Sequence, residues 1–162
     1  LCGQTLCTCR LVTLVKEDGG VELLGAVFKL APSEAGVDNL HAGGMSVGID
    51  LDTGVLQKGR TMADMWQPYR SELENGVRFE GRQLPLWEDV VAAAKRAALA
   101  FPLLPCVGWD IAIADDGPTV IEGNWGWAAD LVQIGMHQGV LTESLVRELE
   151  KIEQKVVKQA KT

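Results

Sequence analysis

The sequence predicts an α+β fold, in which an antiparallel sheet carries helices packed on one face. The order of the elements indicates this class: strand-like runs fill the first half of the chain, and a helix, a second hairpin and a final helix follow. The length of 162 residues suggests one domain. We therefore expect a single domain over residues 1–162.

The amino-terminal segment is predicted to form a long hairpin. Residues 5–16 and 21–31 are rich in Leu and Val, and Glu17–Gly20 between them is a turn signal. We expect two paired strands joined by this turn.

The next segment is less regular. A polar loop over 32–38 leads into a glycine-rich stretch over 39–44. Residues 45–51 alternate between apolar and small or polar side chains, as in a strand with two different faces. A turn over 52–54 leads into another short strand, and residues 62–82 are expected to be irregular.

Leu86–Phe101 is the clearest helical pattern. Pro85 precedes it, Pro102 ends it, and Glu88 and Asp89 lie in the first turn, where the helix dipole favours anions. Its predicted buried stripe comprises Trp87, Val90, Val91, Ala94, Ala97, Ala98 and Phe101.

Two helices are expected near the carboxyl end. A short one covers residues 128–137, and Thr142 caps the last. The buried stripe predicted for the last helix comprises Leu145, Leu149, Ile152 and Val156.

Composition excludes some partners. Fifteen Lys and Arg against 22 Asp and Glu give a net charge of −7, which disfavours nucleic acid and anionic membranes. The longest apolar stretch, residues 97–109, is broken by two prolines and is shorter than the roughly 20 residues of a spanning helix. No signal peptide is visible, and a start at Leu1 suggests a piece of a longer cytoplasmic protein.

The four cysteines are interpreted as free thiols in a reducing cytoplasm. Their spacing is not that of a zinc knuckle. A metal site built from Cys2, Cys7 and Cys9 is the alternative.

The hairpin expected over residues 107–124 carries the strongest chemical signal. If Asp115–Gly117 is a three-residue loop, Asp110 faces Glu122 across the strands, and Asn124 follows on the same face. Opposed carboxylates repel one another unless a cation compensates. Two carboxylates and an amide oxygen would suit Mg²⁺.

In the predicted register Ala112 also faces Val120. The alternative interpretation is that this face is simply solvated and the charges stay apart. A two-residue loop would instead place Asp110 opposite Ile121 and separate the two carboxylates.

Arg10 and Lys29 interrupt the two apolar runs of the first hairpin. With a loop at Gly19-Gly20 the two cations are direct cross-strand neighbours. They would then form an anion site suited to a polyphosphate. The alternative is that each cation only protects a sheet edge.

The glycine-rich stretch is a third candidate. Gly43 and Gly44 allow a ligand close to the backbone, and His41 could touch it. Ser46 and Asp50 are expected on an open face of the following strand. A tight connecting loop is the alternative interpretation.

These residues together resemble the ATP-grasp enzymes, and more closely the sugar-transfer-associated ATP-grasp family. The most specific stretch runs from Val107-Gly108-Trp109-Asp110-Ile111-Ala112 to Glu122-Gly123-Asn124. The other matching stretches are Thr8–Leu14, Val37–Asn39 with Ala42–Gly44, Ile49–Gly54 and Leu84-Pro85-x-Trp87.

The resemblance implies a fold like the carboxyl-terminal ATP-grasp subdomain. It also implies ATP-dependent joining of a carboxylate to an amine or similar nucleophile through an acyl-phosphate. Asp110, Glu122 and Asn124 would hold Mg²⁺ against the ATP phosphates, and Arg10, with Lys29, would bind the transferring phosphoryl group. The acceptor side would be lined by Asn39, His41, Gly43 and Gly44, and the sugar-transfer link suggests polysaccharide biosynthesis.

The sequence departs from the pattern at two points. Cys7 stands where the pattern has Asn. The amino-terminal subdomain, whose lysines grip ATP in these enzymes, is expected as a missing partner. The alternative function is a non-catalytic nucleotide- or metal-binding module or interaction domain.

Overall fold

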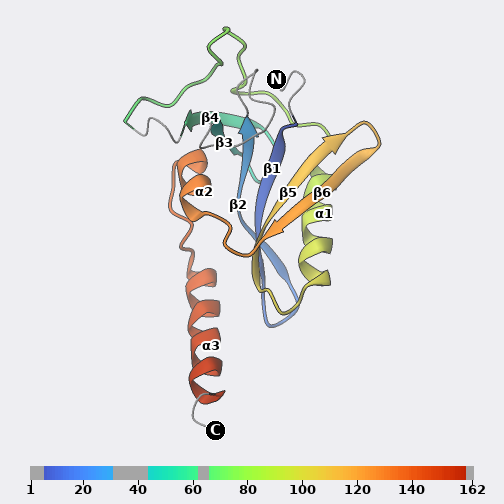
Figure 1. Ribbon diagram of the computed structural model, residues 1–162, viewed down its shortest axis with the longest axis vertical. Coiled ribbons are helices and arrows are strands. Elements are labelled where there is room, and N and C mark those ends of the chain that lie inside the picture. The colour runs from blue at the N-terminus through green and yellow to red at the C-terminus, as the bar shows by residue number, and fades with distance from the viewer. Residues whose placement is uncertain (1–5, 31–43, 62–65, 160–162) are drawn as a thin grey trace.

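The computed structural model describes residues 6–30, 44–61 and 66–159 (Figure 1). Within these residues, six strands and three helices follow one another along the chain. Their bounds are β1 Thr8–Val15, β2 Val21–Leu30, β3 Met45–Ile49, β4 Leu56–Thr61, α1 Trp87–Ala100, β5 Cys106–Ala114, β6 Gly117–Asn124, α2 Ala129–Met136 and α3 Glu143–Gln159.

The six strands form one antiparallel sheet in the order β4-β3-β2-β1-β5-β6. The α+β class and the antiparallel sheet are thus confirmed. β1 is central and pairs with β2 on one side and β5 on the other. The first hairpin therefore lies directly beside the second, although more than 70 residues separate β2 from β5 along the chain.

The predicted placement of the helices on one face is corrected in one respect: α1 and α2 lie against opposite faces (Figure 1). Leu11 of β1 packs in the core that contains α1, whereas the next residue, Val12, packs with α2. Successive strand side chains point to opposite faces. Since β1 is apolar on both, each face must be covered.

α1 begins and ends close to its predicted limits. In its predicted stripe, the buried residues are Trp87, Val90, Ala94 and Ala98, and the half-buried ones are Val91 and Ala97. Phe101 is 54% exposed, because the chain has already left the helix there. Trp87 lies on Gly54, where a Cβ atom would come within 2.3 Å of the indole. Gly54 also has a φ of +74°, so the turn before β4 requires glycine for two reasons.

The predicted direct pairing of Arg10 with Lys29 is wrong. Arg10 lies opposite Val27, and Lys29 lies opposite Thr8, two positions along β1. The turn from Lys16 to Gly20 is longer than a two-residue loop, and the β1–β2 register shifts beyond Val12. A β-bulge of this kind displaces every later pair in the hairpin.

α3 extends away from the sheet (Figure 1). Thr142 accepts a hydrogen bond from the Leu145 N–H at 3.2 Å, which confirms it as the N-cap. Leu145 is buried against α2 and β1, whereas Leu149 is 49% exposed, so the predicted stripe is wrong at Leu149. The other two side chains of that stripe lie outside the described part. Within that part, no helix is both long enough and apolar enough to cross a membrane.

Candidate functional site

Charged side chains from β1, β2, β5 and β6 converge on the face that α2 partly covers. The Arg10 guanidinium donates from Nε to Oδ1 of Asp110 at 2.6 Å and from Nη2 to Oδ2 at 2.7 Å. Lys29 Nζ donates to the same Oδ2 at 2.9 Å. Arg10, Lys29 and Asp110 are all buried. The carboxylate therefore compensates two cations that could not be buried alone.

This environment keeps Asp110 ionised. Burial by itself would raise the pKa of the Asp110 carboxyl. The hydrogen bonds and positive charges of Arg10 and then Lys29 outweigh burial and hold that pKa below its usual value. Asp110 is thus a permanent anion near neutral pH, paired with Arg10.

Glu122 lies directly opposite Asp110, as predicted. The route to this pairing differs from the prediction: the β5–β6 loop has two residues, Ala114 pairs with Gly117, and the register shifts between Asp110 and Ile111. Ile121 is the extra residue of a β-bulge. This bulge restores the pairing that a two-residue loop alone would have lost.

The loop and the bulge also change the rest of the register. Ala112 faces Thr119 and not Val120. Gly117, with a φ of +126°, takes the conformation expected of a glycine after the turn.

Glu122 and Asn124 form the exposed rim of the site. The Asn124 amide donates from Nδ2 to Oε1 of Glu122 at 3.0 Å. The same Oε1 lies 3.6 Å from Arg10 Nη2, and the Glu122 side chain is 55% exposed. Asp110, Glu122 and Asn124 therefore share one face with Arg10.

Trp127 belongs to the site but carried no recognised sequence signal. A Cβ atom on Gly108 would lie 2.6 Å from the Trp127 Cβ and 3.5 Å from Arg10 Cδ. Glycine at 108 thus lets Trp127 lie over β5, close to the side-chain stem of Arg10. The signal that could have found it is a glycine two residues before Asp110, on the same strand face.

Further along this face, near β4, the Arg60 guanidinium stacks on one of two aromatic rings that contact each other. Arg60 lies opposite Ser46, the neighbour of Lys29 across β2 and β3. The Arg60 guanidinium lies 3.9 Å from the centre of the Tyr69 ring, and the Tyr69 and His137 ring centres are 3.6 Å apart. His137 is exposed at the end of α2. Arg60 thus adds a third cation to the face that carries Arg10 and Lys29.

Only the end of the glycine-rich stretch over 39–44 lies within the described residues. Asn39, His41 and Gly43 lie outside the described residues, and Gly44 is buried immediately before β3. The expected open face beyond it is closed at Ser46, whereas Asp50 at the end of β3 is not buried. Ser46 is fully buried, and its hydroxyl donates to the Leu131 carbonyl of α2 at 2.8 Å.

The expectation of four free thiols fails at Cys7, which is disulfide-bonded. Cys9 and Cys106 are free, and burial, followed for Cys9 by the charge of Asp110, raises their pKa values to about 12 and about 11. A thiol must lose its proton to bind metal, so Cys9 is a poor ligand. In the described ranges, no three His, Cys, Asp or Glu side chains form a cluster that could hold a metal ion.

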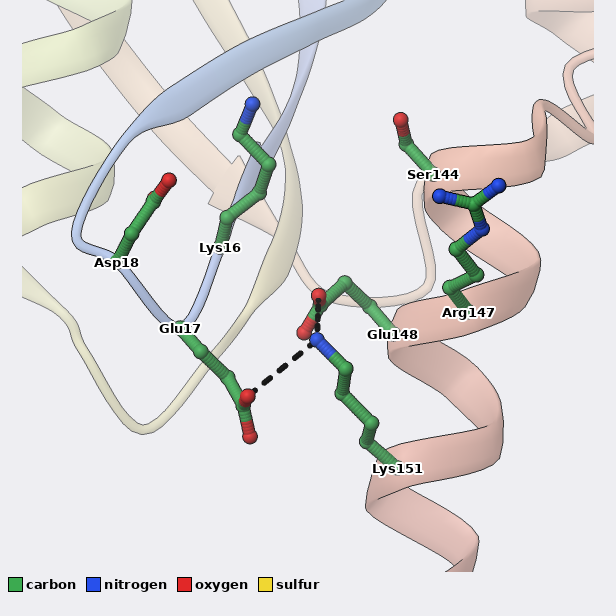
Figure 2. A pocket seen from close by; sticks show the side chains of 7 residues that line it. All are labelled: Lys16, Glu17, Asp18, Ser144, Arg147, Glu148 and Lys151. Carbon is green, nitrogen blue, oxygen red and sulfur yellow. Dashed lines mark hydrogen bonds and ion pairs between the residues drawn. The ribbon is translucent and has the colours of Figure 1, made fainter.

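Figure 2 shows a separate pocket of about 440 Å³ between the β1–β2 turn and α3. It is lined by Lys16, Glu17, Asp18, Ser144, Arg147, Glu148 and Lys151. The Lys151 ammonium lies 2.6 Å from Glu148 and 3.3 Å from Glu17. Three cations and three carboxylates balance here, so this pocket is best described as an ion-paired contact between the turn and α3.

A comparison with protein families now adds to this geometry. A family model described as sugar-transfer associated ATP-grasp matches residues 1–154. The chain belongs to the sugar-transfer associated ATP-grasp family. No curated protein and no solved structure matches the chain. Membership of this ATP-grasp family supports an ATP-dependent, ligase-like activity and a role related to sugar transfer.

ATP-grasp enzymes generally use Mg²⁺, so the donor set can be tested for its fit to this ion. Carboxylate and amide oxygens are the ligands that Mg²⁺ prefers. Glu122 and Asn124 supply both kinds on the exposed rim. Both Asp110 oxygens, in contrast, accept N–H groups from Arg10 and Lys29. The chemistry of the set fits Mg²⁺, and Asp110 can join it only after these cations turn away.

Proposed function

We propose that the whole protein joins a small-molecule carboxylate to an amine or similar nucleophile through an acyl-phosphate, at the expense of ATP. The observation that carries this proposal is the convergence of Arg10, Lys29, Asp110 and Glu122 from four strands. Paired cations and carboxylates on one face suit a bound Mg²⁺-triphosphate, in which charges of both signs must be matched. The family match supports the ATP-dependent part of the proposal.

The proposed reaction has two steps. A carboxylate oxygen of the substrate attacks the γ-phosphorus of ATP, the bond from that phosphorus to ADP breaks, and an acyl-phosphate forms. The amine nitrogen then attacks the acyl carbon, phosphate leaves, and the amine loses a proton. Little covalent chemistry is required of the protein in phosphoryl transfer, so positioning and charge neutralisation supply the catalysis.

The side chains divide these tasks. Arg10 offers a planar pair of N–H donors that matches two phosphoryl oxygens, and Lys29 adds a compact charge beside it. Asp110, Glu122 and Asn124 would hold Mg²⁺, which supplies charge neutralisation at the phosphates. Asn39, His41, Gly43 and Gly44 are proposed to line the acceptor side. An amino-terminal ATP-grasp subdomain is the proposed partner that covers the nucleotide.

The proposal can be tested without knowing the natural amine. The whole protein is incubated with Mg²⁺-ATP, hydroxylamine and a panel of carboxylates, because hydroxylamine converts an acyl-phosphate into a stable hydroxamate. We expect carboxylate-dependent ADP release with equal formation of hydroxamate. ADP release without hydroxamate, for every carboxylate that stimulates it, would contradict an acyl-phosphate.

Glu122→Gln tests the assigned residues in the same assay. We expect the rate to fall at least about a hundredfold, as when a charge-stabilising group is removed from a transition state. Asp116→Asn is the matched control, because it removes a carboxylate from the exposed turn of the same hairpin. Unchanged turnover in Glu122→Gln would remove its role.

A further inference from the structure

The Asp110 carboxylate is closed to a metal ion in this structure. It is only 2% exposed, and its two oxygens accept three N–H donors at 2.6, 2.7 and 2.9 Å. These donors take three of the roughly four acceptor positions of the carboxylate and both of those on Oδ2, so a divalent cation that binds both oxygens must displace at least one of them. The displaced ammonium or guanidinium would then remain buried beside the arriving ion.

The charges around Asp110 make that displacement unfavourable for a free cation. Arg10 and Lys29 carry two positive charges, and Asp110 and the half-exposed Glu122 carry two negative ones. A free dication would add two more positive charges within a few ångströms. Repulsion between like charges is much stronger in a buried site than in water.

A phosphate-bearing ligand reverses this balance. Phosphate oxygens are strong acceptors for guanidinium and ammonium groups, and a triphosphate carries more negative charge than one carboxylate. If the ligand accepts the N–H groups of Arg10 and Lys29, Asp110 is left as an uncompensated anion. A divalent cation is then attracted by Asp110 and by the phosphates together.

We propose that Arg10 and Lys29 keep Asp110 closed to free divalent cations until a polyphosphate ligand accepts their N–H groups. This inference rests on the proposed function, because it concerns binding order at the same site. Such coupling is reciprocal: the metal raises polyphosphate affinity by the same factor by which the polyphosphate raises metal affinity.

The inference makes an unusual prediction for Lys29→Gln, tested on the whole protein with Mn²⁺ alone as the probe. Removing this cation frees an acceptor position on Oδ2 of Asp110. Mn²⁺ should therefore bind at least about fivefold more tightly, the lower end of the range for coupled sites. Electron paramagnetic resonance counts the free ion directly. Lys58→Gln is the matched control, because Lys58 is exposed on β4. Adding Glu122→Gln to Lys29→Gln should abolish the gain.

A measurement on the unchanged protein covers the case in which Lys29→Gln fails to fold. The Arg10 Nε–H signal in a proton–nitrogen NMR spectrum, assigned by its loss in Arg10→Lys, reports the pairing with Asp110. Mg²⁺ alone should leave this signal in place, and inorganic triphosphate in a metal-free buffer should move it.

The outcomes separate this inference from the proposed function. Equal or weaker Mn²⁺ binding by folded Lys29→Gln, or an Arg10 signal that moves with Mg²⁺ alone, overturns the binding order and leaves the ligase proposal standing. Tighter Mn²⁺ binding by Lys29→Gln supports the closure of Asp110 even where the hydroxamate assay is negative.

Discussion

At the scale of single residues, Asp110 determines the stability of the charged site. Its pKa is lowered in the folded protein, so its stabilising contribution is complete above the ordinary Asp pKa of about 3.9 and is lost as pH falls through the lower folded value. Asp110→Asn leaves two buried cations uncompensated. We expect it to lower the free energy of unfolding by about 3–5 kcal/mol at pH 7, the cost of breaking a buried ion pair.

Urea unfolding at several pH values checks this prediction. The difference between the wild type and Asp110→Asn should be constant above about pH 5. It should shrink below about pH 4, where the unfolded wild-type chain takes up a proton at Asp110 and the folded protein does not. Asp116→Asn, on the exposed turn, should stay within about 0.5 kcal/mol of the wild type. A pH-independent loss in Asp110→Asn would mean that packing, and not charge, explains it.

Sequence reasoning found the charged residues but not all of their neighbours. A charge inside an apolar run marked Arg10, and hairpin alternation placed Glu122 opposite Asp110. The diagonal placement of Lys29 depends on a bulge that leaves no pattern in the sequence. The contact of Arg10 with Asp110 joins residues 100 positions apart through the β1–β5 pairing, for which local patterns carry no information.

At the scale of elements, α3 is held at two kinds of contact. Leu145 is 4% exposed in the core beside α2, whereas Lys151 and Glu17 meet on the surface. Surface ion pairs contribute little because water and salt screen them. The attachment of α3 should therefore depend mainly on its first turn.

Two leucines of the same helix provide the test. Leu145→Ala should lower the free energy of unfolding by about 2–5 kcal/mol, the range for a buried leucine, and should speed amide exchange along α3. Leu149→Ala should cost less than about 1 kcal/mol, because that side chain is already half exposed. Equal losses would show that α3 packs along its whole length.

Helix prediction succeeded where the local signals are strong. Pro85 and Pro102 enclose α1, and Thr142 caps α3. Which face each helix covers is set by the order of strands in the sheet, so the placement of α1 and α2 on opposite faces could not be predicted from either helix alone.

At the scale of the whole molecule, the candidate site lies on one sheet, with Glu122 and Asn124 on its edge strand. Tight nucleotide binding requires the adenine and the phosphates to be held from both sides. We expect residues 1–162 alone to bind Mg²⁺-ATP no more tightly than about 1 mM, an interaction of about −4 kcal/mol, and to show no turnover.

Calorimetry on this chain and on the whole protein checks that expectation. The whole protein should bind Mg²⁺-ATP at least about tenfold more tightly, a gain of about 1.4 kcal/mol that the proposed amino-terminal subdomain would supply by covering the nucleotide. Micromolar binding by residues 1–162 would show that the sheet and Trp127 suffice.

The bulge at Ile121 has a consequence for how this hairpin can change. It gives β6 one residue more than a regular ladder against β5 would use. Deleting Ile121 should therefore leave a regular hairpin in which Glu122 directly follows Val120 and still lies opposite Asp110. Deleting Val120 as well removes a residue that no bulge can absorb, and it should move Glu122 to the opposite face of the sheet. The site can thus tolerate the loss of one residue from β6, but not the loss of two.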